Sequence, residues 1–153
     1  HALGEPFVFV FFGPVAVTGT HYLLAGGWSA TALLVALAPA ATVTAILVVN
    51  NLRDLEGDRL SAKRTLAVVL GERGTRWEYA LLMAAPFALV TGTVAAGLIP
   101  AGALTVWIGA VPAARLAGRV LGGLRGRELN RVLAHTGLTH LLLCLLLAAG
   151  IAW

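Results

Sequence analysis

The chain has 153 residues, of which 59% are hydrophobic and only 12% are charged, and its mean hydropathy is +0.88. A soluble domain needs polar side chains over its whole surface, and a disordered chain has a low apolar content, so this composition excludes both classes. The net charge of +4 does not indicate nucleic acid as a partner, because a phosphate-binding surface needs a soluble protein face around it. The composition is that of an integral membrane protein.

Five apolar stretches are each long enough to cross a bilayer core, which takes about 20 helical residues. In chain order they are Pro6–Leu24, Trp28–Asn50, Trp77–Ala96, Leu98–Leu116 and Val132–Trp153. The sequence therefore predicts an all-α fold, a polytopic membrane helix bundle with five transmembrane helices. We treat residues 1–153 as part of a single domain, with charged loops at about 51–76 and 117–131.

The charged residues give the orientation. Apart from Glu5, every charged side chain lies between Arg53 and Glu78 or between Arg115 and Arg131, and the second stretch is almost entirely basic. Basic loops next to membrane spans tend to stay in the cytoplasm. Five spans then run from a cytoplasmic N-terminus to an external C-terminus, and the arginines of the second loop are expected to contact membrane lipid head groups.

Asn50, Asp54 and Asp58 are the first candidate site residues, and they follow the second span directly. If the helix continues, residues four apart stack on one face, about 6 Å from one another along the axis. Mg²⁺ prefers oxygen ligands, and it commonly takes one or two carboxylates while it also binds substrate phosphates. The spacing predicts a metal site at Asp54 and Asp58.

Basic residues accompany these carboxylates. Arg53, Lys63 and Arg64 are candidates for binding a diphosphate, the arginines through a planar fork and the lysine as a point charge. The same pattern is also typical of a solvated charged surface beside a membrane. Polar clusters at a membrane edge are costly, however, and that favours a functional site.

A resemblance to a known family rests on two longer runs. One is Asn50-Asn51-x-Arg53-Asp54-x-x-x-Asp58 with the later Lys63-Arg64-Thr65-Leu66-Ala67-Val68, and the other is Gly4-Glu5-Pro6 through Gly13-Pro14. The first run resembles the second aspartate-rich motif of UbiA-type intramembrane prenyltransferases. Within that superfamily, both runs are most similar to the 1,4-dihydroxy-2-naphthoate prenyltransferases of menaquinone synthesis.

The resemblance implies a nine-helix membrane fold with two aspartate-rich motifs, of which this sequence has only the second. We therefore expect a C-terminal half, the last five helices, that is inactive without the missing N-terminal half. The implied reaction transfers a polyprenyl group from polyprenyl diphosphate to 1,4-dihydroxy-2-naphthoate, giving demethylmenaquinone, with Mg²⁺ as the cofactor. The implied location is a prokaryotic cell membrane, with the active site facing the cytoplasm.

The resemblance also implies roles for individual residues. Asp54 and Asp58 would hold the metal, Arg53, Lys63 and Arg64 would bind the diphosphate, and Asn50 and Asn51 would line the site. Two alternatives stay open: a related enzyme with another aromatic acceptor such as 4-hydroxybenzoate, and a non-catalytic helical membrane subunit. For Glu5, a position at the membrane interface and one inside the cavity are equally compatible with the sequence.

Overall fold

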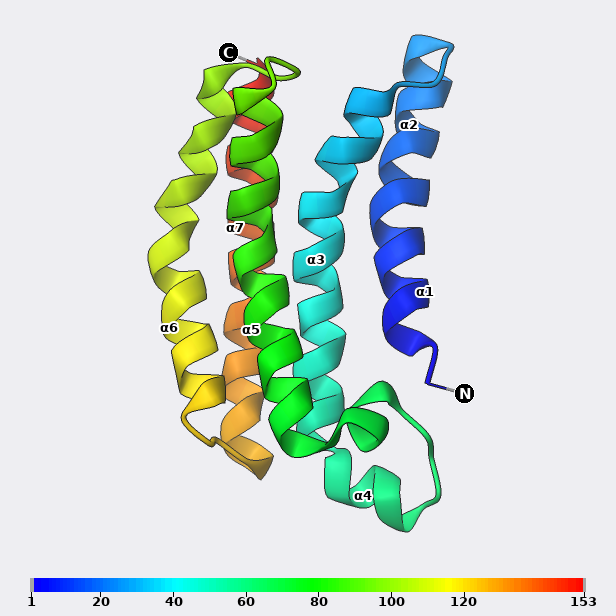
Figure 1. Ribbon diagram of the computed structural model, residues 1–153, viewed down its shortest axis with the longest axis vertical. Coiled ribbons are helices and arrows are strands. Elements are labelled where there is room, and N and C mark those ends of the chain that lie inside the picture. Colours follow the sequence, from blue (N-terminus) through cyan, green and yellow to red (C-terminus); the bar gives the residue numbers. More distant parts are fainter. Residues whose placement is uncertain (1, 153) are drawn as a thin grey trace.

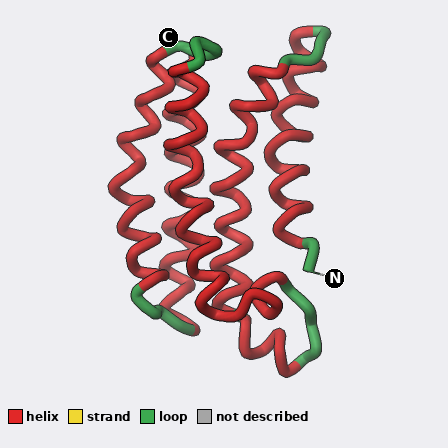
Figure 2. Tube along the Cα trace, in the orientation of Figure 1, coloured by secondary structure: helices red, strands yellow, loops and turns green. Residues whose placement is uncertain are grey.

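The computed structural model describes residues 2–152, and all of the regular structure in that range is helical (Figures 1 and 2). The elements are α1 (Gly4–Val10), η1 (Phe11–Val15), α2 (Ala16–Ala25), α3 (Ala30–Arg53), α4 (Leu55–Leu60), α5 (Leu66–Ala95), η2 (Ala101–Gly109), α6 (Ala110–Leu121), η3 (Gly126–Glu128) and α7 (Leu129–Ala152). Five helical segments are long and apolar enough to cross a membrane, and they run over residues 4–25, 30–53, 66–95, 101–121 and 126–152. The prediction of five spans is confirmed, and the chain fits an integral membrane protein.

The boundaries differ most at the start of the third span. α5 begins at Leu66, eleven residues before the predicted start, and Gly71 interrupts it with φ +72° and ψ 173°. Glycine adopts this positive φ without the steric cost that a Cβ would bring. The predicted loop at 51–76 therefore contains α4 and the first eleven residues of α5. The fourth span continues to Leu121, five residues past its predicted end.

α3 lies at the centre of the bundle. It packs against α5 and α7 on one side and against α1, η1 and α2 on the other, while α6 closes the group by contacting both α5 and α7 (Figure 1). The first span is the least buried, and it faces outwards with large apolar side chains such as Phe7, Phe12 and Leu24. Such a surface suits lipid or other membrane helices.

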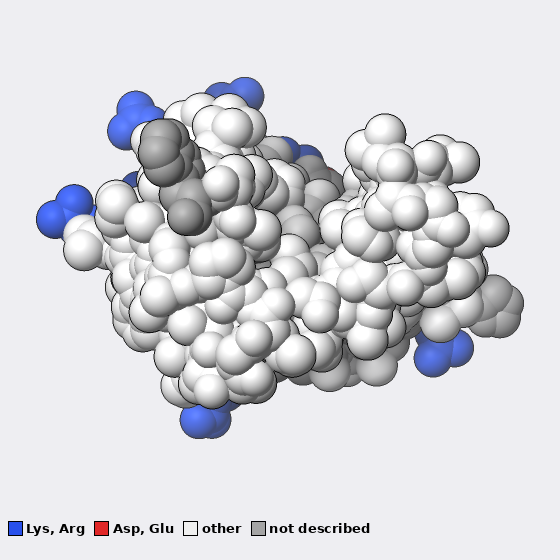
Figure 3. All heavy atoms as spheres, turned by 90° about the horizontal axis from the view of Figure 1, so that it is seen from above, with Lys and Arg blue, Asp and Glu red and all other residues white. Residues whose placement is uncertain are grey.

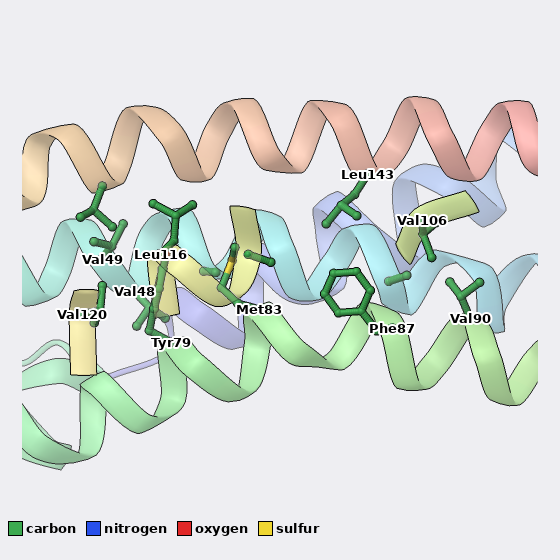
Figure 4. Packing of buried hydrophobic residues seen from close by; sticks show 14 of the residues in the cluster. Val48, Val49, Tyr79, Met83, Phe87, Val90, Val106, Leu116, Val120 and Leu143 are labelled. Atoms are coloured by element: carbon green, nitrogen blue, oxygen red, sulfur yellow. The ribbon is translucent and has the colours of Figure 1, made fainter. Parts of the chain in front are cut away.

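The core runs along α5 between α3, α6 and α7. Tyr79, Met83 and Phe87 follow one another along this helix at the spacing of one face, and Figure 4 shows them directed towards the neighbouring helices. The Tyr79 hydroxyl is buried at 2.7 Å from Oγ1 of Thr136 on α7. This hydrogen bond satisfies a polar group that would otherwise be stranded in an apolar interior.

Small residues allow two close helix contacts. A Cβ built on Gly13 would lie 2.2 Å from the Cβ of Ala40, so η1 approaches α3 only because position 13 lacks a side chain. η1 is a short π-helix, and Pro14, which cannot donate a backbone hydrogen bond, explains why the α-helical pattern is interrupted here. At the far end of the bundle, a Cβ on Gly150 of α7 would lie 2.2 Å from the carbonyl oxygen of Gly102. Such contacts are typical of helix packing in membranes.

The two ends of the bundle differ in charge. We call the end where α3 stops and α5 and α7 begin the charged end, because it carries the stretches from Arg53 to Arg76 and from Arg115 to Arg131. Figure 3 looks onto the opposite end, where nearly all visible atoms belong to uncharged residues and no acidic side chain is in view. The chain starts near the charged end and finishes near the other, as an odd number of spans requires (Figure 1).

Candidate functional site at the charged end of the bundle

The backbone carries the Asn50, Asp54 and Asp58 spacing through the end of α3. The helix changes direction at Asp54, where φ is −93° and ψ is 3°. Nevertheless, the Asp54 amide donates to the Asn50 carbonyl at 3.1 Å, and the Asp58 amide donates to the Asp54 carbonyl at 2.8 Å. The predicted succession of three polar residues one turn apart is therefore present, although α3 and α4 are separate elements.

Arg53 joins three of the polar side chains around it. Its Nε and Nη2 atoms each donate to a different carboxylate oxygen of Asp54 at 2.7 Å, and Nη2 also donates to Oδ1 of Asn50 at 2.9 Å. The Nη1 atom reaches Oδ1 of Asn130 on α7 at 3.0 Å. Hydrogen bonding from Arg53 lowers the pKa of Asp54. The guanidinium thus holds the end of α3 against the start of α7.

Asp58 is the more enclosed of the two aspartates. Its side chain is 9% exposed, against 42% for Asp54, and Lys63 lies 3.2 Å and 3.3 Å from its two carboxylate oxygens. The segment after α4 folds back around it, since the Lys63 amide donates to the Asp58 carbonyl at 2.9 Å. Lys63 itself is 60% exposed, so its ammonium group can exchange partners.

The Asn51 side chain is buried inside the bundle. Its Nδ2 donates to Oε1 of Glu5 at 2.7 Å, and both residues are buried. The structure therefore places the Glu5 side chain inside the helix bundle. Glu78 on α5 lies close enough to Glu5 for the two carboxyl groups to interact electrostatically. Its Oε2 atom is buried without a hydrogen-bond partner among residues 2–152.

Not every predicted residue joins the cluster. Arg64 is exposed and makes no ion pair within 4 Å in the described part of the chain. Sequence reasoning also missed Asn130, the partner of Arg53. The only available signal was a polar residue beside the fifth span, which does not reveal a contact across 77 positions.

A second polar cluster fastens α5 to the turn after α6. The buried Arg76 donates to the carbonyl oxygens of Val120 and Leu124, the latter at 2.8 Å, and pairs with Glu72 at 2.6 Å. Arg125 holds the same carboxylate with two hydrogen bonds of 2.8 Å and 2.7 Å. Arg125, for which we expect contact with lipid head groups, is thus also an ion-pair partner of Glu72. This cluster and Arg53 border a pocket of about 290 Å³.

Two carboxylates alone would not enclose a metal ion, so a metal bound here would need further ligands from another molecule. Within residues 2–152, no group of three or more His, Cys, Asp or Glu side chains is arranged to hold a metal ion. Mg²⁺ does not need such a group, because one or two carboxylates are enough when substrate phosphates supply further ligands. Asp54 and Asp58 are two carboxylates one turn apart, and each is paired with one cation, Arg53 or Lys63.

The fold and this cluster define a class: a helical membrane protein with paired carboxylates and cations at one end of its bundle. Comparison with known families makes the class specific, because the model of the UbiA prenyltransferase family matches residues 1–134. The chain belongs to the UbiA prenyltransferase family, and the resemblance seen in its motifs is confirmed.

Several relatives carry the same kind of name. The chain is 43% identical to a 1,4-dihydroxy-2-naphthoate octaprenyltransferase of Mycobacterium tuberculosis, over 98% of this chain and 50% of the relative. It is 39% identical to the protein of that name from Mycobacterium leprae, over 97% and 49%. A third, from Escherichia coli, is 43% identical over 53% of this chain and 26% of its own length. No solved structure matches. The chain spans about half the length of the first two relatives.

Proposed function

We propose that the complete polypeptide containing these residues transfers a polyprenyl group from polyprenyl diphosphate to 1,4-dihydroxy-2-naphthoate. One observation carries the proposal: the 43% identity, over nearly all of this chain, to a relative named for that reaction. The cluster at the charged end supports it, because carboxylates and cations close together are the groups that a metal-bound diphosphate needs. We further propose that residues 1–153 alone are inactive, since they supply only one pair of carboxylates.

The chain's own residues would act on the leaving group. Asp54 and Asp58 would hold Mg²⁺, which when bound neutralises charge on the diphosphate. Arg53 and Lys63 would turn from the aspartates to the phosphate oxygens, and the exposed Arg64 would approach from the loop. Such donors stabilise the charge that develops as the bond between carbon and oxygen breaks.

The transfer replaces one bond by another. The allylic carbon loses its bond to the diphosphate oxygen, which keeps the electron pair, and forms a bond to the electron-rich naphthoate ring. The ring carboxyl group leaves that position as carbon dioxide. Asn50 and Asn51 would line the site, where the bond from Asn51 to Glu5 fixes the amide in position.

We also propose an orientation. The charged end would face the cytoplasm of a prokaryotic cell membrane, since basic residues beside membrane spans are retained there. The surplus of arginines between Arg115 and Arg131 supports this direction. The isoprenoid tail of the donor, which is apolar, would then remain within the bilayer while its diphosphate reaches Asp54 and Asp58.

The test compares Asp54→Asn and Asp58→Asn with the parent polypeptide in a prenyl transfer assay. Glu56→Gln is the matched control, because it removes an acidic charge from an exposed position between the two aspartates. We expect each aspartate variant to lose at least about 100-fold in turnover and the control to keep it. Removal of Mg²⁺ by a chelator should stop the reaction.

Other results would assign the site differently. Undiminished turnover in both aspartate variants would remove the metal assignment. Preferred transfer to 4-hydroxybenzoate would mean a related enzyme with another aromatic acceptor. Absence of both transfer and Mg²⁺-dependent pyrophosphate binding would favour a non-catalytic membrane subunit.

A further inference from the structure

A groove between α6 and α7 lies outside the candidate site. It has a volume of about 390 Å³, and one wall carries Arg115 and Arg119, four residues apart on α6. The other wall, on α7, carries Leu138 and Leu142, one turn apart, together with the polar side chains of His135 and Thr139. The groove therefore brings two guanidinium groups next to apolar side chains.

The guanidinium groups in this region lack acidic partners. Among residues 2–152, none of Arg115, Arg119, Arg127 or Arg131 has a carboxylate within 4 Å. A smaller pocket next to the groove shares Arg119 and adds Arg127 and Arg131. The acidic residue there, Glu128, leaves the four arginines in clear excess.

Arg115 lies within the fourth span, where a cation without a paired carboxylate is costly. It lies six residues before Leu121, the last residue of the fourth span, which is about 9 Å along a helix. An exposed cation at that depth in a membrane is costly unless an anion accompanies it. An anion bound in the groove would compensate the charge of Arg115, and the leucines on the α7 wall would suit an apolar chain attached to that anion.

We propose that this groove binds an anionic glycerophospholipid. Arg115 and Arg119 bind its phosphate through their planar forks, and one acyl chain lies along Leu138 and Leu142. The pocket at Arg127 and Arg131 accommodates the rest of the head group. This is a defined site for one lipid molecule, distinct from a general attraction of basic loops to the membrane.

The site does not depend on the proposed prenyl transfer. Arg53, Asp54, Asp58 and Lys63 take no part in the groove. A variant that loses phospholipid can therefore keep metal and diphosphate binding, and the failure of one proposal leaves the other standing.

The experiment uses the complete polypeptide, freed of lipid in a neutral detergent and titrated with phosphatidylglycerol or with phosphatidylcholine of the same acyl chains. Native mass spectrometry counts the bound lipids. We expect a preference for phosphatidylglycerol that falls about fivefold for each arginine replaced in Arg115→Gln and Arg119→Gln. Arg73→Gln is the control, because Arg73 is an exposed cation at the same end of the bundle and outside the groove.

Further variants separate the possible occupants. Arg119→Lys should keep part of the preference, because the charge remains while the fork is lost. If the variant that carries both Arg115→Gln and Arg119→Gln does not fold, Arg119→Gln alone tests the same point, because Arg119 lines both pockets. Glycerol phosphate, which has the head group and no acyl chain, should not displace the lipid at equal concentration.

Three results would overturn the proposal. The first is equal binding of the two lipids by the parent, and the second is an unchanged preference in the arginine variants. The third is displacement of the phospholipid by polyprenyl diphosphate at equal concentration, which would assign the groove to the donor.

Discussion

Asn51 and Glu5 are 46 positions apart in the chain, yet the Asn51 amide donates a 2.7 Å hydrogen bond to the Glu5 carboxylate inside the bundle. Glu5 is 4% exposed and Asn51 5%. The bond ties the beginning of the first span to the last turns of the second. It also fixes the amide next to Asn50, one of the residues that contact Arg53.

Replacing Glu5 should show how much this hydrogen bond contributes to the free energy of unfolding. Glu5→Ala removes the acceptor and leaves a buried amide N–H without a partner, so we expect a loss of about 1–2 kcal/mol in the free energy of unfolding. Glu5→Gln keeps an oxygen acceptor and should lose less. Unfolding of the complete polypeptide in mixed micelles measures both, and equal losses would mean that the bond contributes little.

The Arg53–Asp54 pair should make stability depend on pH at the acidic end. Arg53 lowers the pKa of Asp54 in the folded protein, so the folded state favours the charged carboxylate. This contribution is complete above the ordinary aspartate pKa of about 3.9 and is lost as the pH falls through the lowered value. The stability difference between the parent and Asp54→Asn should therefore be constant at neutral pH and shrink below about pH 4. A difference that grows with acidification would contradict the assignment.

Arg76 should matter far more than Arg125, although both bind Glu72. Arg76 is buried and donates to two backbone carbonyls at the end of α6, so Arg76→Ala leaves those acceptors unsatisfied. We expect a loss of about 2–3 kcal/mol. Arg125 is exposed, and Arg125→Ala should have a small effect that salt abolishes. Thermal unfolding in detergent at low and high salt distinguishes the two.

The contact of Gly150 with Gly102 leaves no room for a methyl group. Gly150→Ala should separate α7 from η2 and destabilise the protein by about 1–3 kcal/mol. Gly137→Ala is the matched control on the same helix, because a Cβ there meets no atom within 4 Å. Alanine favours helix more than glycine does, so the control should be neutral or stabilising. Similar losses in both variants would indicate a general intolerance of α7.

The spans could be predicted because the bilayer imposes one strong constraint, a run of about 20 apolar helical residues. The start of α5 at Leu66 could not, since residues 66–76 are polar enough to suggest a loop. The structure makes them helical by capping, with the Thr65 hydroxyl accepting from the Val68 amide, and it bends the helix at Gly71. Local chemistry of this kind does not alter the apolar pattern from which spans are inferred.

The candidate site, too, could be predicted from the sequence only in part. The four-residue spacing predicted that Asn50, Asp54 and Asp58 stack on one face if the helix continues; the backbone hydrogen bonds between them are present, but the helix is interrupted at Asp54. The metal and diphosphate roles stay predictions. The contact from Arg53 to Asn130 could not be predicted, because it depends on how two distant spans pack.

The charges of Arg53, Asp54, Asp58 and Lys63 cancel in the structure, because each cation pairs with one carboxylate. Binding Mg²⁺ alone would leave both cations without partners, and binding pyrophosphate alone would leave both carboxylates. Binding the two together exchanges all partners at once. Under the proposed roles, this balance would link the two ligands thermodynamically: each should raise the affinity for the other by the same factor, as calorimetric titrations in either order can measure.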